Sequence, residues 1–174
     1  MSLVKNDQSI TQDLIKHRFS YDPETGVFIH RNPTSSRCKI GEVAGNSVGS
    51  APYLYVGINY KRYAAHRLAW LYVYGEWPDA EIDHVNGNGH DNRICNLRKA
   101  SPSQNQFNQK LPKNNKSGVK GLFWIERLGK WRACVAKTKD GFNGYLGIYS
   151  SRDDAIEAIK RGRKLLHGEF SNDG

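Results

Sequence analysis

The sequence predicts an α+β fold made of small modules, and three observations predict it. Apolar and polar residues alternate between turn signals in the first sixty residues, which is typical of short antiparallel strands. Two stretches, 65–74 and 152–167, carry apolar residues at helical spacing. A Lys- and Asn-rich segment, 110–116, contains a proline and separates two regions of different composition, as an extended linker does. A chain of 174 residues has room for one domain or for two or three such modules.

The first module, residues 1–62, is expected to be rich in strands. Residues 10–19 are weakly helical, 21–26 form a turn, and strands follow at 26–30 and 53–58. This segment either contacts a partner of the protein or only buttresses the next module, and its pattern favours neither alternative.

The helix at 65–74 is expected to pack beneath the strand that comes after it. Its apolar stripe consists of Leu68, Trp70, Leu71 and Tyr74. His66 and Arg67 stand at its positive end, where exposed side chains can contact phosphate. A single histidine at a helix start is also often a packed or capping residue, so both roles stay open for His66.

The most informative stretch is 82–98, which reads IDHVNGNGHDNRICNLR. Asp83 and His84 are neighbours on a short strand and therefore point to opposite faces, so one can hold a metal while the other meets a water or a phosphate. The Asn, Asp and Gly residues after them are turn formers that let the chain double back. A helix is expected to begin at Ser101 and Pro102, with Asn105 in its first turn or just beyond.

This order of residues resembles the His-Asn-His (HNH) nucleases, specifically the phage and intron homing endonucleases with their D-H-x-[ND]-G-N…N-L-R…N pattern. The resemblance implies a ββα-metal core of two strands and a helix around one divalent cation. It implies that Asp83 and Asn105 bind the metal, that His84 is the general base, and that Asn96 pins the loop. Because carboxylate and amide oxygens are hard ligands, Mg²⁺ or Mn²⁺ is the expected cofactor. Arg98, which ends the motif, joins His66 and Arg67 as an expected DNA contact. Because basic strand hairpins that precede this motif in the family often touch DNA, the resemblance makes DNA contact one of the two roles open to residues 1–62.

Composition agrees with a DNA-handling protein. The chain has 26 Lys and Arg against 17 Asp and Glu, a formal charge of +9, which suits a polyanionic partner such as double-stranded DNA. Cys38, Cys95 and Cys134 are single and widely spaced, so we expect no structural zinc and no disulfide framework. With no recognisable signal peptide and no apolar run long enough to span a membrane, we expect a protein of the host-cell cytoplasm that acts on no small-molecule substrate.

The last module, residues 117–174, predicts a three-stranded antiparallel sheet and one helix. Strands are expected at 118–124, 129–135 and 144–149, and Ser151 with Asp154 forms a capping box for the helix at 152–167. Its S-G-V-K-G, G-K-W and L-G-x-[FY] signatures resemble the plant ethylene-response-factor (Apetala) DNA-binding domain over residues 117 to about 168. That resemblance implies that the exposed face of the sheet lies in the major groove.

Strand alternation is used to choose the side chains of that face. The residues expected there are Lys120, Trp124, Arg132, Asn143 and Tyr145. The residues expected to face the helix are Val119, Phe123, Trp131, Ala133 and Val135. Leu122, Cys134 and Ala136 occupy positions where the resembled family usually carries charged residues, so its target sequence is not carried over. Trp124 fits core packing equally well.

The sequence thus predicts a strand-rich segment (1–62), an HNH core (63–109), a linker (110–116) and a DNA-binding domain (117–174). The predicted function is hydrolysis of DNA phosphodiester bonds to 5′-phosphate and 3′-hydroxyl ends, by a monomer or a homodimer. The alternatives are a non-catalytic DNA-binding regulator with an inert motif and a non-specific defence nuclease.

Overall fold

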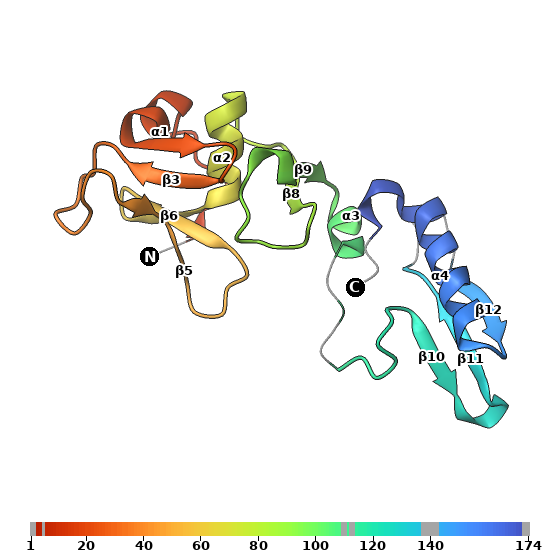
Figure 1. Cartoon of the computed structure of the whole chain (residues 1–174). Coiled ribbons are helices and arrows are strands. Elements are labelled where there is room, and N and C mark those ends of the chain that lie inside the picture. Colours follow the sequence, from red (N-terminus) through yellow and green to blue (C-terminus); the bar gives the residue numbers. More distant parts are fainter. Residues whose placement is uncertain (1–2, 5, 109–110, 112–113, 137–142, 172–174) are drawn as a thin grey trace. The chain divides into compact units, whose positions relative to one another are not determined.

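A computed structural model describes residues 3–4, 6–108, 111, 114–136 and 143–171 (Figure 1). The chain divides into two compact units, Met1–Ser101 and Pro102–Gly174. Both units mix small sheets with a few helices, as an α+β fold does. Within the described residues, no helix is long and apolar enough to cross a membrane.

Within its described residues, the first unit contains three small sheets and two helices. Its helices are α1 (Gln12–Arg18) and α2 (Ala65–Tyr74), with one 3₁₀ turn, η1 (Ile94–Asn96). One sheet has the order β1-β7-β6-β5 and a second the order β2-β3-β4, while β8 and β9 form an antiparallel hairpin. The strands are β1 (Leu3–Val4), β2 (Phe19–Asp22), β3 (Val27–His30), β4 (Val43–Ala44), β5 (Asn46–Ser47), β6 (Leu54–Ile58), β7 (Lys61–Ala64), β8 (Glu81–His84) and β9 (Leu97–Ala100).

One hydrophobic core joins the N-terminal strands to the hairpin. Phe28 of β3 and Leu68 of α2 are buried in the same cluster as Ile82 of β8 and Leu97 of β9. The expected helix at 65–74 is present, and Leu68 and Leu71 are buried as the stripe predicts. Tyr74 departs from that expectation: it is 54% exposed and packs on Trp70 at a ring-centroid distance of 4.4 Å, because it lies in the last turn beyond the core.

The second unit is a three-stranded antiparallel sheet covered on one face by a helix, as predicted. The sheet has the order β10-β11-β12 and α4 packs against it (Figure 1). The Ser151 hydroxyl caps α4 by accepting from the backbone N–H groups of Asp153 and Asp154. Its elements are α3 (Pro102–Phe107), β10 (Leu122–Ile125), η2 (Glu126–Leu128), β11 (Lys130–Cys134), β12 (Tyr145–Tyr149), α4 (Arg152–His167) and η3 (Gly168–Phe170).

The register of β10 decides which face each of its two aromatic residues takes. Leu122 is 1% exposed beneath α4, and Trp124, two residues on, shares its face and packs on Trp131 at 4.9 Å. Phe123 instead pairs with Arg132 on the open face and is 46% exposed. The prediction placed Phe123 towards the helix, which was wrong because the buried Leu122 fixes which residues of this strand face the core. For Trp124, the register selects the core side, one of the two positions that the sequence left open.

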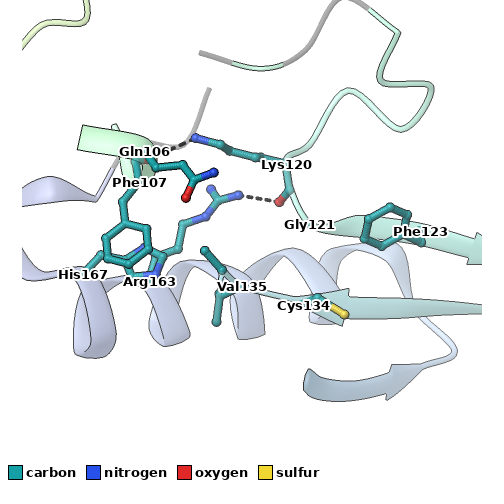
Figure 2. A pocket seen from close by; sticks show the side chains of 10 residues that line it. Gln106, Phe107, Lys120, Gly121, Phe123, Cys134, Val135, Arg163 and His167 are labelled. Carbon is teal, nitrogen blue, oxygen red and sulfur yellow. Dashed lines mark hydrogen bonds between the residues drawn. The ribbon is translucent and has the colours of Figure 1, made fainter. Parts of the chain in front are cut away.

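The helix α3 belongs to the second unit, so the division of the chain falls inside the expected nuclease core of 63–109. The Phe107 ring stacks on His167 of α4 with centroids 3.9 Å apart, and Lys120 Nζ donates to the Phe107 carbonyl at 3.1 Å. Figure 2 shows these contacts around a cavity of about 220 Å³. The buried Arg163 lines this cavity and donates to the Lys120 carbonyl.

Candidate active site and DNA-binding face

The β8–β9 hairpin places an ion pair beside a buried histidine. Asp83 and Arg98 are direct partners in its register, and Arg98 reaches Asp83 Oδ2 with Nε at 2.9 Å and with its NH2 nitrogen at 2.8 Å. Asp83 is 4% exposed, so the guanidinium compensates a carboxylate that is almost fully removed from water. The prediction did not include this pairing, which engages Arg98 inside the hairpin.

His84 is held by a buried amide that fixes its tautomer. Its Nε2 lies 3.2 Å from Asn92 Oδ1, while the other end of that amide, Nδ2, donates to the His90 carbonyl at 3.4 Å. Because an amide oxygen only accepts, Nε2 carries the proton, and the lone pair of the neutral ring is on Nδ1. Burial lowers the pKa of His84 below its usual 6.5, against the opposing effects of the Asn92 hydrogen bond and the Asp83 charge. His84 is therefore neutral near pH 7, as a general base must be.

Two aromatic side chains enclose the His84 ring. Tyr53 stacks on it with centroids 5.7 Å apart, and His66 meets it edge-on at 5.1 Å. Burial lowers the pKa of His66 to about 3, with His84 and Arg67 adding repulsion. His66 Nδ1 is buried and has no hydrogen-bond partner within the described residues. The cluster thus holds two neutral imidazoles side by side.

The loop after His84 is fastened by Asn96. Its Oδ1 accepts from Asn86 N at 3.0 Å, and its Nδ2 donates to Asn86 Oδ1 at 3.1 Å and to the Asp91 carbonyl at 2.8 Å. The Asp91 carboxylate is in turn bound by Arg93, which lowers its pKa to about 2. These bonds give the loop one conformation in which Asn92 reaches His84.

The N-terminal strands buttress this loop from behind. The Tyr21 hydroxyl donates to the Asn92 carbonyl at 2.7 Å, and both residues are buried. A Cβ on Gly26 would lie 2.4 Å from Arg93 N, so only glycine permits this approach. A Cβ on Gly89 would lie 2.0 Å from the Pro52 carbonyl oxygen. The N-terminal strands therefore support the loop after His84, which is one of the two roles that the sequence left open. DNA contact by these strands stays a prediction.

His66 and Arg67, at the start of α2, are buried and are 7% and 6% exposed. For Arg67 this departs from the expected exposure, and for His66 it agrees with the packed role that the sequence also left open. The Arg67 guanidinium donates to the carbonyls of Pro78 and Ala80 and to Asn6 Oδ1, so DNA contact by Arg67 would require these bonds to break. A contact between His66 and phosphate stays a prediction.

The expected metal ligands are Asp83, in the first unit, and Asn105, on α3 in the second. Their oxygens are the donors that Mg²⁺ and Mn²⁺ accept. No group of three or more His, Cys, Asp or Glu side chains able to hold a metal is found among the described residues. Within the first unit, the Asp83 carboxylate is a hard oxygen donor of the kind that such a cation binds, and its Oδ2 is held by Arg98. Cys38, Cys95 and Cys134 are free thiols.

The residues chosen for DNA contact in the second unit fall into two groups. Arg132 and Asn143 are exposed and Tyr145 is 47% exposed, as the prediction requires. Lys120 precedes β10 and binds the Phe107 carbonyl, and Trp124 lies on the helix-facing side. Phe123 and Ile148 take their place beside Arg132 on the open face.

Sequence reasoning missed Asn92, Tyr53 and Tyr21. Asn92 is one of several Asn, Asp and Gly residues in the loop, and its composition gives no reason to choose it. Its only signal is spacing, eight residues after His84 and two residues before the η1 turn begins. Tyr53 and Tyr21 reach the site through long-range packing that no local pattern reveals.

Comparison with known proteins supports the motif. The family described as HNH endonuclease matches residues 63–107. The chain is 36% identical over 115 residues to Protein 3.8 of Escherichia phage T7, an alignment that covers 64% of this chain and 91% of that protein. It is 31% identical over 108 residues to Uncharacterized HNH endonuclease L560 of Acanthamoeba polyphaga mimivirus, covering 61% of this chain and 54% of that protein. No solved structure matches the chain.

Proposed function

The chain belongs to the HNH endonuclease family, and from this premise we propose that it is a phage-type homing endonuclease that hydrolyses DNA phosphodiester bonds with one divalent metal. The observation that carries the proposal is the His84–Asn92 hydrogen bond, which leaves a neutral imidazole with its lone pair on Nδ1 beside Asp83. A buried, neutral and oriented imidazole is what general-base catalysis at neutral pH needs.

In this mechanism Nδ1 of His84 takes a proton from the attacking water. The water oxygen forms a bond to phosphorus as the bond from phosphorus to the 3′ oxygen breaks, and the departing oxygen receives a proton from solvent. The Nε2–H bond to Asn92 persists throughout and stabilises the imidazolium that forms. The products are a 5′-phosphate and a 3′-hydroxyl.

Asp83 is the residue of the first unit that would hold the cation, and Asn105, in the second unit, stays the further ligand that the family resemblance implies. Bound Mg²⁺ or Mn²⁺ would supply Lewis-acid stabilisation of the scissile phosphate and of the leaving 3′ oxygen. Arg98 keeps the Asp83 carboxylate oriented in the hairpin, and Asn96 keeps the loop that carries Asn92 in place.

DNA affinity is assigned mainly to the second unit. Residues 102–174 carry 14 Lys and Arg against 7 Asp and Glu, so +7 of the chain's +9 formal charge lies there. Such an excess attracts DNA through phosphate contacts and counterion release, which weaken as salt rises. An Apetala-like use of the open face of β10, β11 and β12 is part of the proposal, as are Arg132, Asn143 and Tyr145 as its contacts.

The test is cleavage of supercoiled plasmid by the purified chain with Mg²⁺, with Mn²⁺ and with EDTA. Nicked or linear products with discrete bands, dependent on the metal and carrying 5′-phosphate ends, are expected. An intact plasmid that is nevertheless bound supports a non-catalytic regulator, and a smear supports a non-specific defence nuclease. Sequencing the ends identifies the site and distinguishes nicking from double-strand cleavage.

A further inference from the structure

The open face of the C-terminal sheet carries an unusual row of side chains. Phe123, Arg132 and Ile148 are register partners across β10, β11 and β12, so they lie side by side on one face. Phe123 is 46% and Ile148 is 41% exposed, although both are large apolar residues. The row therefore presents a cation flanked by two apolar groups.

The charges of this face match a polyanion. Lys130 and Arg132 lie on it, and no acidic side chain is found among the described strand residues of the sheet. Asp153 and Asp154 lie in the first turn of α4, and this helix covers the opposite face of the sheet. The described strands of this face thus offer an anionic partner cations and apolar groups without an acidic side chain, and the acidic residue of the β10–β11 turn, Glu126, lies beyond the end of β10.

The chemistry of the row fits base edges in the major groove of duplex DNA. Thymine displays a C5 methyl group there, next to an acceptor oxygen, and guanine displays two acceptors that suit a guanidinium. Neighbouring strands lie about 4.8 Å apart, so three side chains in a row cover roughly 10 Å. That width fits within a groove about 12 Å wide, and it corresponds to about three base-pair steps of 3.4 Å.

Stacking of unpaired bases fits the same face less well. The Arg132 guanidinium carbon lies over the Phe123 ring, 5.0 Å from its centroid, so one face of that ring is already covered. Ile148, on the other side of Arg132, has no π-face on which a base can stack. Both side chains still offer the apolar surface that a methyl group requires.

We propose that Phe123 and Ile148 read thymine C5 methyl groups in the major groove, on either side of a base pair or phosphate contacted by Arg132. This inference rests on the proposed function in requiring duplex DNA as substrate, and it adds a specificity that the nuclease motif does not contain. The target of the enzyme is thereby expected to be thymine-containing, with the apolar contacts setting which positions must be thymine.

The experiment compares two pools of the same random duplexes, one amplified with dTTP and one with dUTP, which removes every C5 methyl and keeps base pairing. Binding of the full chain is measured in EDTA, where metal-dependent cleavage does not occur. We expect the dUTP pool to bind about fourfold more weakly for each methyl lost, the fold-change that matches burial of one methyl-sized group. Sequencing the bound dTTP duplexes should give thymines at fixed positions.

Two variants and one control make the assignment specific. Phe123→Ala and Ile148→Ala should each reduce the wild-type difference between the pools by about fourfold, the contribution of one methyl contact, and their combination should bind the two pools nearly equally. Leu165→Ala, at an 85% exposed position on α4, should keep the wild-type difference. Circular dichroism of each variant shows whether the unit is folded, and Ile148→Thr offers a milder change if Ile148→Ala is not.

Equal binding of both pools by the folded wild type overturns the proposal, as does an unchanged dTTP preference in both variants. Stronger binding to single-stranded than to duplex pools also overturns it and assigns the face to base stacking. Plasmid cleavage with Mg²⁺ is scored separately, so a chain that cuts but ignores the methyl groups refutes only this inference. A chain that distinguishes the pools but never cuts refutes only the nuclease function.

Discussion

Replacing Asn92 by alanine should disable the base without disturbing DNA binding. Asn92 is 1% exposed, and its Oδ1 is the acceptor for His84 Nε2 at 3.2 Å. The change leaves a buried N–H without a partner, which costs about 1–3 kcal/mol. If that cost is expressed as lost orientation of His84 in the transition state, the cleavage rate falls roughly 5- to 150-fold.

The assay is single-turnover cleavage at saturating DNA, with binding measured in parallel. Asn88→Ala is the matched control, because Asn88 is an exposed residue of the same loop whose Oδ1 accepts only from His90 N among the described contacts. It should cut at nearly the wild-type rate. An Asn92→Ala chain that cuts as fast as wild type, or one whose binding falls in step with its cleavage, refutes the argument.

Asn92→Asp extends the same test to pH. A carboxylate at this position stabilises the imidazolium and raises the pKa of His84, which burial lowers in the wild type. The base is then protonated at higher pH, so the acid limb of the rate profile moves from below pH 6.5 toward neutrality. A limb that does not move contradicts His84 as the titrating base.

The packing of the site leads to three further predictions. Gly26→Ala and Gly41→Ala both place alanine at a positive φ, but only at Gly26 does backbone lie 2.4 Å from the new Cβ. Gly26→Ala alone should therefore lower the cleavage rate and the urea midpoint by more than the roughly 1 kcal/mol of backbone strain explains. Equal losses in the two variants would contradict the role of the N-terminal strands in supporting the loop. The pKa of His66 is about 3 in the folded chain, so only the unfolded chain binds a proton at this residue between pH 6.5 and 3. The free energy of unfolding is therefore unaffected by His66 above pH 6.5 and declines by up to about 1.4 kcal/mol per pH unit as pH falls toward 3. His66→Gln should flatten the pH dependence of urea unfolding, and an unchanged slope would refute this. Arg98→Gln removes the guanidinium that pairs with the buried Asp83, at a cost to stability of about 3–5 kcal/mol. Added Mg²⁺ should raise the thermal midpoint of this variant more than that of the wild type. Equal shifts would argue against metal binding at Asp83.

Helix positions could be predicted from the sequence because their signals are local. The apolar spacing of Leu68 and Leu71 and the cap at Ser151 depend only on neighbouring residues, and α2 and α4 have the predicted bounds. The faces of β10 could not be assigned in the same way. Two large aromatic residues in sequence, Phe123 and Trp124, fit either face, and only the pairing with β11 and the burial of Leu122 decide between them.

The site shows the same division between local and long-range information. The order of Asp83, His84 and Asn96 is visible in the sequence because they lie within one hairpin and its loop. The burial of Arg67 depends on two acceptors outside its own helix. The Asn6 side chain is 61 residues away in the sequence, and the Pro78 carbonyl lies between α2 and β8. The Phe107–His167 stack, which joins α3 to the second unit, connects residues sixty positions apart. Such partners are set by tertiary packing, which periodicity does not encode.

Cleavage by His84→Ala tests the central claim most directly. The variant and the wild type are compared on the same supercoiled plasmid with Mg²⁺, while binding to that DNA is measured in EDTA and the fold is checked by circular dichroism. The account predicts that the folded variant binds as wild type does and leaves the plasmid intact, since a general base is needed only in the transition state. A folded variant that converts the plasmid at near the wild-type rate would contradict the assignment of His84 as the base.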